Sequence, residues 1–175
     1  RRPMDATTII STLAQSAAPE SLYAAALFAE QSGQAGAAET LMARIPEGSR
    51  TEEMNGFVLG LRAEAAVTRA RALGAQGQQQ AALQSLRQIA DTPGLPAAQT
   101  ATIATALFEL GDTQTASMLA QRAAGMPVAS AEAYDPIVRV LAATGQDMAA
   151  EEALSRATQL AGGTAQGMQT VATLR

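Results

Sequence analysis

The sequence predicts an all-α fold made of helix-turn-helix repeats, and three observations lead to this prediction. Of the 175 residues, 47% are hydrophobic and only 3% are aromatic, with Ala and Leu prominent among the apolar residues. Alanine-rich chains with few β-branched or aromatic residues favour helices. Glycines recur at a fixed spacing, and prolines or glycines lie where the second helix of each repeat should end.

Four glycines define the period. Gly33, Gly77, Gly111 and Gly145 are separated by 44, 34 and 34 residues. Each lies between two stretches of apolar periodicity, so each is predicted to end one helix in a left-handed conformation before the chain reverses into the next. Five residues after each glycine an alanine lets the two helices approach closely, and these alanines are Ala38, Ala82, Ala116 and Ala150.

Apolar residues at matching distances from each glycine predict the buried faces of both helices. Nine and twelve residues after the glycine, on the second helix, lie Met42 with Ile45, Leu86 with Ile89, Ala120 with Ala123, and Leu154 with Ala157. Seven and four residues before it, on the first helix, lie Ala26 with Ala29, Ala70 with Leu73, Ala104 with Leu107, and Val138 with Leu141.

Pro46, Pro93, Pro127 and the pair Gly162-Gly163 are placed to end the four second helices. With the 34-residue period, this pattern resembles the tetratricopeptide repeat family over residues 19–162, with alanine at many of the family's large positions. The resemblance implies helix pairs stacked as a right-handed solenoid. Arg69 departs from the pattern, because an apolar residue is expected eight positions before the glycine, as at Ile103 and Ile137.

A stack of this kind continues or is capped at both ends, because each helix pair has an apolar face that only a neighbour can cover. Asp5 is placed to cap a helix with Ile9, Ile10 and Leu13 on its apolar side, and Met168, Val171 and Ala172 fit a further first helix. We therefore expect the chain to be cut from a longer array. The predicted parts are the last helix of a preceding repeat (1–18), repeat 1 (19–46), an insertion or extra helical segment (47–58), repeat 2 (59–94), repeat 3 (95–128), repeat 4 (129–162) and the first helix of a following repeat (163–175).

The first glycine interval exceeds the period by ten residues, and the excess falls between Pro46 and about Gly56. Ser49 or Thr51 can cap the helix that follows, so the first helix of repeat 2 is predicted to be either overlong or split. Gly56 and Gly60 weaken this helix and are the candidate hinge. Two interpretations remain open: a surface insertion without consequence, and a bend that redirects the solenoid.

Composition limits the function classes. The chain has no Cys or His, which removes thiolate and imidazole chemistry and argues against a metal site or a catalytic centre. No catalytic residue, metal ligand or cofactor site is predicted. The net charge of −4, from 12 basic and 16 acidic residues, includes no basic block for nucleic acid, and no apolar run is long enough to cross a membrane.

A solenoid presents its first helices on a concave wall, where such proteins usually bind peptides or helices. We call the predicted set the first-helix wall. It consists of Glu20, Tyr23, Leu27, Glu64, Arg71, Thr105, Phe108, Asp135 and Arg139. Tyr134 is assigned to the core by its phase, whereas Tyr23 and Phe108 stay open between packing and binding. Arg71 and Arg139 are expected to be solvated or to form ion pairs within their own helices, rather than to anchor an acidic partner.

A second resemblance concerns residues 45–90. The residues concerned are Ser49-Arg50-Thr51 through Asn55, Leu61-Arg62, Arg69-Ala70-Arg71 to Gly77, and Ala81-Ala82 to Leu86-Arg87. This stretch is similar to the periplasmic tetratricopeptide repeat region of the bacterial cellulose export protein, a component of the cellulose synthase complex. The resemblance implies a periplasmic array that precedes an outer-membrane pore, guides cellulose export and contacts other synthesis proteins. Direct contact with the glucan chain is left open.

Two function classes therefore compete. The first is a non-catalytic periplasmic scaffold in cellulose or other exopolysaccharide export that binds proteins of the synthesis complex. The second is a generic cytosolic adaptor that binds a peptide or helix in its concave groove. An enzyme is the third and least supported class.

Overall fold

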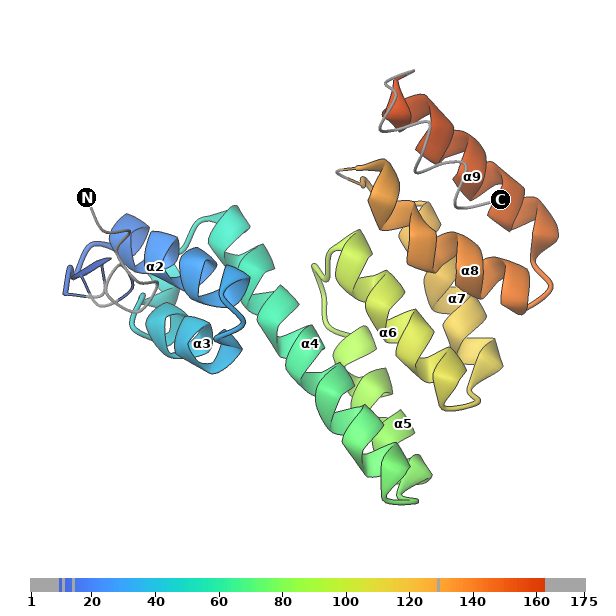
Figure 1. Ribbon diagram of the computed structural model, residues 1–175, viewed down its shortest axis with the longest axis horizontal. Coiled ribbons are helices and arrows are strands. Elements are labelled where there is room, and N and C mark those ends of the chain that lie inside the picture. Colours follow the sequence, from blue (N-terminus) through green and yellow to red (C-terminus); the bar gives the residue numbers. More distant parts are fainter. Residues whose placement is uncertain (1–9, 11, 14, 129, 163–175) are drawn as a thin grey trace. The chain divides into compact units, whose positions relative to one another are not determined.

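The computed structural model describes residue 10 and residues 12–13, 15–128 and 130–162, and this part of the chain is helical and contains no strand (Figure 1). The all-α prediction is confirmed for these residues. The helix predicted near Met168 lies outside the described residues, as does most of the helix predicted near Asp5, of which Ile10 and Leu13 pack partly buried against the first core. The helices are α2 (Pro19–Gln31), α3 (Ala35–Ala43), α4 (Glu52–Ala75), α5 (Gln79–Ala90), α6 (Ala97–Glu109), α7 (Thr113–Ala124), α8 (Asp135–Ala143) and α9 (Asp147–Ala161), with 3-10 helices η1 (Glu47–Ser49) and η2 (Ala131–Tyr134).

The chain divides into two compact units, Arg1–Leu61 and Arg62–Arg175, and the division falls within α4. In the first unit, α2 packs on α3. Its core combines residues of both helices, such as Leu22 and Met42, with Met54 and Leu61 from the first part of α4. Burial of these apolar side chains holds the unit together, at about 25 cal/mol for each Å² removed from water.

The four predicted turn glycines end their helices in the left-handed conformation, with φ of 75° at Gly33, 78° at Gly77, 86° at Gly111 and 73° at Gly145. Each glycine N–H donates to a carbonyl three residues back, and the next residue donates to a carbonyl five residues back, as from Gln34 to Ala29 at 2.8 Å. This is the Schellman arrangement, which gives partners to carbonyl groups that the helix end leaves free. The prediction from the glycine spacing is confirmed at all four turns.

Of the overlong and the split alternatives for the helix after the insertion, the overlong one is correct, because α4 is one helix of 24 residues. Thr51, rather than Ser49, caps it, since the Thr51 hydroxyl accepts a hydrogen bond from the backbone N–H of Met54 at 3.2 Å. The helix runs through Gly56 and Gly60 without a break, and their action as a hinge stays a prediction.

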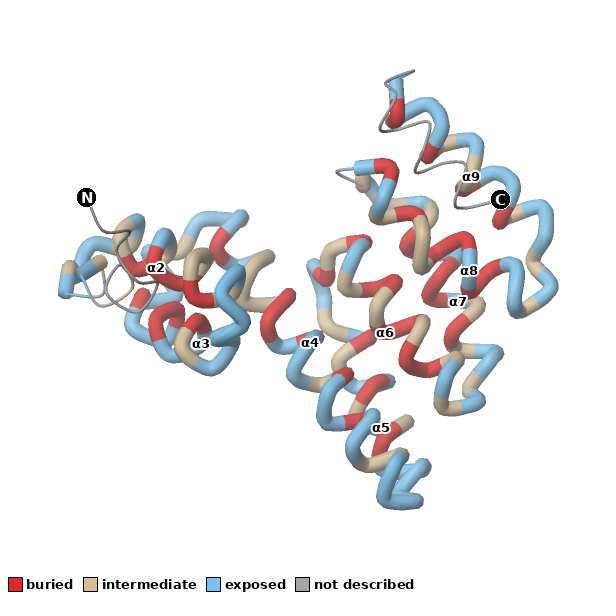
Figure 2. The backbone as a smooth tube through the Cα atoms, viewed as in Figure 1, coloured by how far each residue is buried: buried red, intermediate tan, exposed pale blue. Residues whose placement is uncertain are grey.

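The second unit is built around α6. This helix packs on α7, α8 and α5, and α8 also packs on α7 and α9 (Figure 1). Figure 2 shows the corresponding concentration of buried residues along α6. Leu107 and Leu141 are both fully buried, and Thr100, the one buried polar side chain among the described residues, donates to the Pro96 carbonyl at 3.0 Å.

Most of the predicted buried faces are confirmed. The alanines five residues after each turn glycine are buried, and Tyr134 is in the core at 4% exposure. Three predicted positions, Leu73, Ile89 and Leu154, are only partly buried. Arg69 is exposed, so the departure from the apolar pattern at this position places a charge in solvent and not in the core.

One glycine has a packing role that the period did not indicate. A Cβ atom at Gly74, in the last turns of α4, would lie 2.6 Å from a methyl carbon of Leu110. An alanine at this position would therefore require the Leu110 side chain to shift.

Candidate binding surfaces

The α2 residues of the first-helix wall differ in their exposure and in the contacts that they already make. Glu20 is exposed and Leu27 is partly buried. The Tyr23 ring packs edge to face on Phe57, with ring centres 5.6 Å apart, and its hydroxyl donates to Glu53 at 3.2 Å. Burial, the negative charge of Glu53 and this hydrogen bond raise the pKa of Tyr23. Tyr23 is thus mainly a packing residue that ties α2 to the start of α4.

On α4 and α6, a salt bridge joins two first helices. Arg71 donates from Nε and Nη2 to the two carboxylate oxygens of Glu109, at 2.9 and 3.2 Å. Arg71 forms no pair within its own helix, because its partner lies 38 residues away on α6, but its half-exposed side chain fits the solvated alternative. Both side chains are about half exposed, so the pair contributes at most about 1 kcal/mol to stability. Glu64, further back on α4, is exposed.

The remaining wall residues lie on α6 and α8. Thr105 and Phe108 are partly buried, and the Thr105 hydroxyl donates to the Ala101 carbonyl one turn back. Arg139 pairs with Asp135 at 3.0 Å within α8, which confirms the intrahelical pair predicted for Arg139. No hydrogen bond or ion pair connects these α6 and α8 residues in the described part of the chain. The α2 residues of the wall belong to the first unit, and those on α6 and α8 belong to the second.

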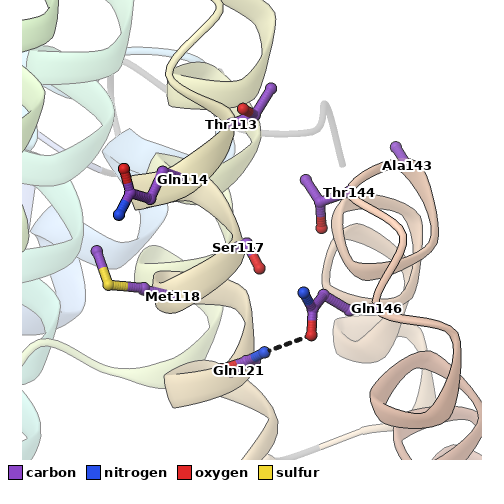
Figure 3. A pocket seen from close by; sticks show the side chains of 8 residues that line it. All are labelled: Thr113, Gln114, Ser117, Met118, Gln121, Ala143, Thr144 and Gln146. Carbon is purple, nitrogen blue, oxygen red and sulfur yellow. Dashed lines mark hydrogen bonds between the residues drawn. The ribbon is translucent and has the colours of Figure 1, made fainter.

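A pocket of about 530 Å³ lies elsewhere, on the second helices, where the sequence predicted no site. We call it the glutamine pocket. It lies between α7 and the turn from α8 to α9, and in Figure 3 the Gln121 side chain on α7 reaches Gln146 across it, at 2.9 Å from Nε2 to Oε1. Its lining residues are Thr113, Gln114, Ser117, Met118, Gln121, Ala143, Thr144 and Gln146.

The Gln121–Gln146 contact has an equivalent one period earlier. There Arg87 donates to the Asp112 carboxylate at 2.9 and 2.6 Å, and each residue precedes its counterpart by 34 positions. Asp112 also caps α7, accepting from the Thr115 N–H at 3.2 Å. Burial opposes ionisation of Asp112, but the hydrogen bonds from Arg87 and Thr115 outweigh it and lower its pKa below the ordinary value of 3.8.

A second contact also repeats at the period. Arg122 on α7 donates to the carbonyl of Ala90, the last residue of α5, at 2.8 Å. Arg156 on α9 donates in the same way to the carbonyl of Ala124, the last residue of α7, at 2.5 Å. A guanidinium at a helix C-terminus satisfies a free carbonyl and complements the negative end of the helix dipole. We call these contacts the arginine C-caps.

The repetition of these arginines was visible in the sequence as a matched pair 34 residues apart, but their partners were not, because a carbonyl has no sequence signature. Near the first of these caps, a smaller pocket of about 340 Å³ lies between the end of α5 and α7. It includes Asp91 and is also bordered by Met118, which is 55% exposed. Neither pocket therefore includes a residue of the first-helix wall.

Within the described residues, no group of three or more acidic, Cys or His side chains is arranged to hold a metal ion. Every described helix is too short or too polar to span a bilayer. In comparisons with known proteins, no family model and no curated protein matches the chain.

Proposed function

We propose that this chain is a non-catalytic scaffold built from tetratricopeptide-type repeats that binds proteins. The observation that carries the proposal is the agreement between the 34-residue period and the contacts. The arginine C-cap of Arg122 recurs one period later at Arg156, and the contact of Arg87 recurs at Gln121. Contacts that repeat between successive pairs are what a stack of equivalent units requires.

The helix order of the second unit supports the same proposal. Successive helices pack on each other from α5 to α9, and the two first helices α6 and α8 also touch. Nearest-neighbour packing of this kind is typical of repeat proteins, in which each unit covers the apolar face of the next. A scaffold role also suits a chain without Cys or His, the residue types that most often act as nucleophiles and proton carriers.

The cellular role that we propose is in the periplasm, in the export of cellulose or a related exopolysaccharide. It rests on the similarity of residues 45–90 to the repeat region of the bacterial cellulose export protein. In this role the array spaces and contacts proteins of the synthesis complex on the way to an outer-membrane pore. The competing role is a cytosolic adaptor for a peptide or helix.

The flanking gene sequence distinguishes the two roles. The export role requires a secretion signal before this segment and an outer-membrane pore domain after it, and a gene that encodes neither would rule it out. Binding is tested by capture of periplasmic proteins on the immobilised chain, with cellohexaose as a parallel probe and mass spectrometry to identify what is retained.

A wall variant and a matched control then locate the contact. Thr105→Arg places a long charged side chain on the α6 part of the first-helix wall, and Gln84→Arg places the same side chain on an exposed position of α5. We expect the Thr105→Arg variant to lose binding of the identified partner and the Gln84→Arg variant to keep it. Equal retention by both variants would contradict binding at the wall.

A further inference from the structure

The contact region between α5 and the turn before α7 is called the first junction, and the one between α7 and the turn before α9 the second. The two can be compared residue by residue, because matching positions differ by one period of 34. At the first junction, the Gln79 side chain on α5 donates to the Leu110 carbonyl in the turn before α7. The counterparts of these two residues are Thr113 and Thr144. A threonine side chain is shorter than a glutamine, so Thr113 does not span the second junction in the same way.

Further replacements widen the second junction. Leu83, partly buried on α5, corresponds to Ser117 on α7, and the side chain of Leu110 corresponds to that of Thr144. Together with Thr113, these smaller residues leave the glutamine pocket of about 530 Å³. The pocket is open to solvent, so it is a groove on the surface and not an enclosed cavity. At Thr113, Ser117 and Thr144 the pocket is thus lined by smaller side chains than those at the matching positions of the preceding repeat.

The chemistry of the pocket is polar and uncharged. Its lining contains three hydroxyl groups, from Thr113, Ser117 and Thr144, and three side-chain amides, from Gln114, Gln121 and Gln146. The first junction has a salt bridge at the positions where this one has two glutamines. The lining has no charged side chain that could pair with a charged ligand, whereas a neutral ligand with both donors and acceptors finds partners for each.

The paired amides favour one type of neutral ligand. In the Gln121–Gln146 hydrogen bond, Gln121 uses one of its two N–H donors and Gln146 uses its carbonyl (Figure 3). The Gln121 carbonyl, the second Gln121 N–H and both N–H groups of Gln146 remain. The Gln121 carbonyl can accept from the N–H of a peptide unit, and a Gln146 N–H can donate to its C=O. A saccharide is less well suited, because the lining has no aromatic ring to stack on a sugar face and no carboxylate to accept from its hydroxyl groups.

We propose that the glutamine pocket binds an extended peptide segment made of uncharged residues. Gln121 and Gln146 hold the peptide backbone, and Thr113 and Ser117 supply further hydrogen bonds from α7. The exposed Met118 side chain at the edge offers an adaptable apolar contact for one side chain of the peptide. This site is separate from the first-helix wall, and its ligand chemistry does not depend on the proposed export role.

The test uses the whole 175-residue chain and a phage-displayed library of random dodecapeptides. Enriched sequences are synthesised with blocked termini, and their affinities are measured by calorimetry for the chain and its variants. Ser117→Leu fills the pocket with the side chain that Leu83 already provides one period earlier. Ser155→Leu is the matched control, because it makes the same change at an exposed position of α9 that does not line the pocket.

We expect the enriched peptides to be poor in charged residues, to lose about tenfold or more in affinity with Ser117→Leu, and to keep their affinity within about twofold with Ser155→Leu. The side-chain amide NMR signals of Gln121 and Gln146 should shift on binding. If Ser117→Leu does not fold, Thr113→Gln, which restores the residue type of Gln79, takes its place.

Two results would overturn the proposal. One is a selection in which no enriched peptide is weakened by the pocket-filling variant. The other is binding of cellohexaose that the same variant abolishes, since the pocket would then be a saccharide site.

Discussion

Replacement of Asp112 should separate two contributions of its carboxylate to stability, the cap of α7 and the salt bridge with Arg87. Asp112 caps α7 through the Thr115 N–H at 3.2 Å and accepts the Arg87 guanidinium at 2.9 and 2.6 Å, with only 9% of its side chain exposed. Asp112→Asn keeps an oxygen that can cap the helix but removes the charge. Asp112→Ala removes both.

The expected magnitudes follow from exposure. The Arg87 side chain is 54% exposed, so its pair with Asp112 should contribute about 0.5–1 kcal/mol, near the upper end for surface pairs. Loss of a helix N-cap costs about 1 kcal/mol, with a range of roughly 0.5–2. We therefore expect the free energy of unfolding to fall by about 0.5–1 kcal/mol in Asp112→Asn and by about 2 kcal/mol in Asp112→Ala.

The assay is urea unfolding at pH 7 followed by circular dichroism, with Glu151→Gln, a neutralised exposed carboxylate on α9, as the control. Arg87→Met, which keeps most of the aliphatic stem, completes a double-mutant cycle with Asp112→Asn. Equal losses in Asp112→Asn and Asp112→Ala would show that the cap contributes nothing. A coupling energy of zero between Arg87→Met and Asp112→Asn would show that the salt bridge contributes nothing to stability.

The pH dependence gives an independent check on the same carboxylate. Its folded-state pKa is lowered, so its contribution is fully present above the unfolded-state pKa of about 3.9 and is lost as the pH falls through the lower folded-state value. The difference in stability between the natural chain and Asp112→Asn should be constant from pH 7 to about pH 5 and should shrink below about pH 4. A difference that grows on acidification would refute the assigned direction of the pKa shift.

Three further predictions use the same unfolding assay. Gly145→Ala should lower the free energy of unfolding by about 1–2 kcal/mol, because φ is 73° there. Gly56→Ala should raise it by up to about 1 kcal/mol, because Gly56 is helical and a Cβ there meets nothing within 4 Å. Effects of the same sign would contradict this reasoning. Arg122→Met should cost about 0.5–1 kcal/mol by removing an arginine C-cap, and no loss would mean that water replaces the guanidinium without penalty. Leu107→Ala, at a fully buried position, should cost about 2–5 kcal/mol, and a loss below about 1 kcal/mol would place Leu107 outside the core.

The sequence predicted the structure best where a residue type is favoured by one particular backbone conformation. A glycine between two helices indicates a left-handed turn, and all four turn glycines have positive φ. Alanines at fixed distances from them indicated close helix contacts, and the phase of Tyr134 placed it in the core. These inferences depend on local geometry and on the period, both of which can be read along the chain.

Contacts between distant side chains could not be predicted in the same way. Arg71 finds Glu109 on another helix, although Asp135 and Arg139, four residues apart, form the local pair that their spacing predicts. The glutamine pocket was missed because it depends on what is absent, namely the longer side chains of the preceding repeat. A comparison of Ser117 with Leu83 along the period would have indicated it.

The arginine C-caps have a consequence for how the chain can be divided. Arg156 lies on α9, yet it completes the end of α7, whose last residue is Ala124. A fragment cut at the turn after α7 would have intact helices by sequence, but its final carbonyl would lose its guanidinium and face water alone. The contacts that stabilise the end of one helix pair therefore include a residue of the following pair. A shortened version of this protein that ends with α7 should be extended through α9 as far as Arg156, so that the end of α7 keeps its cap.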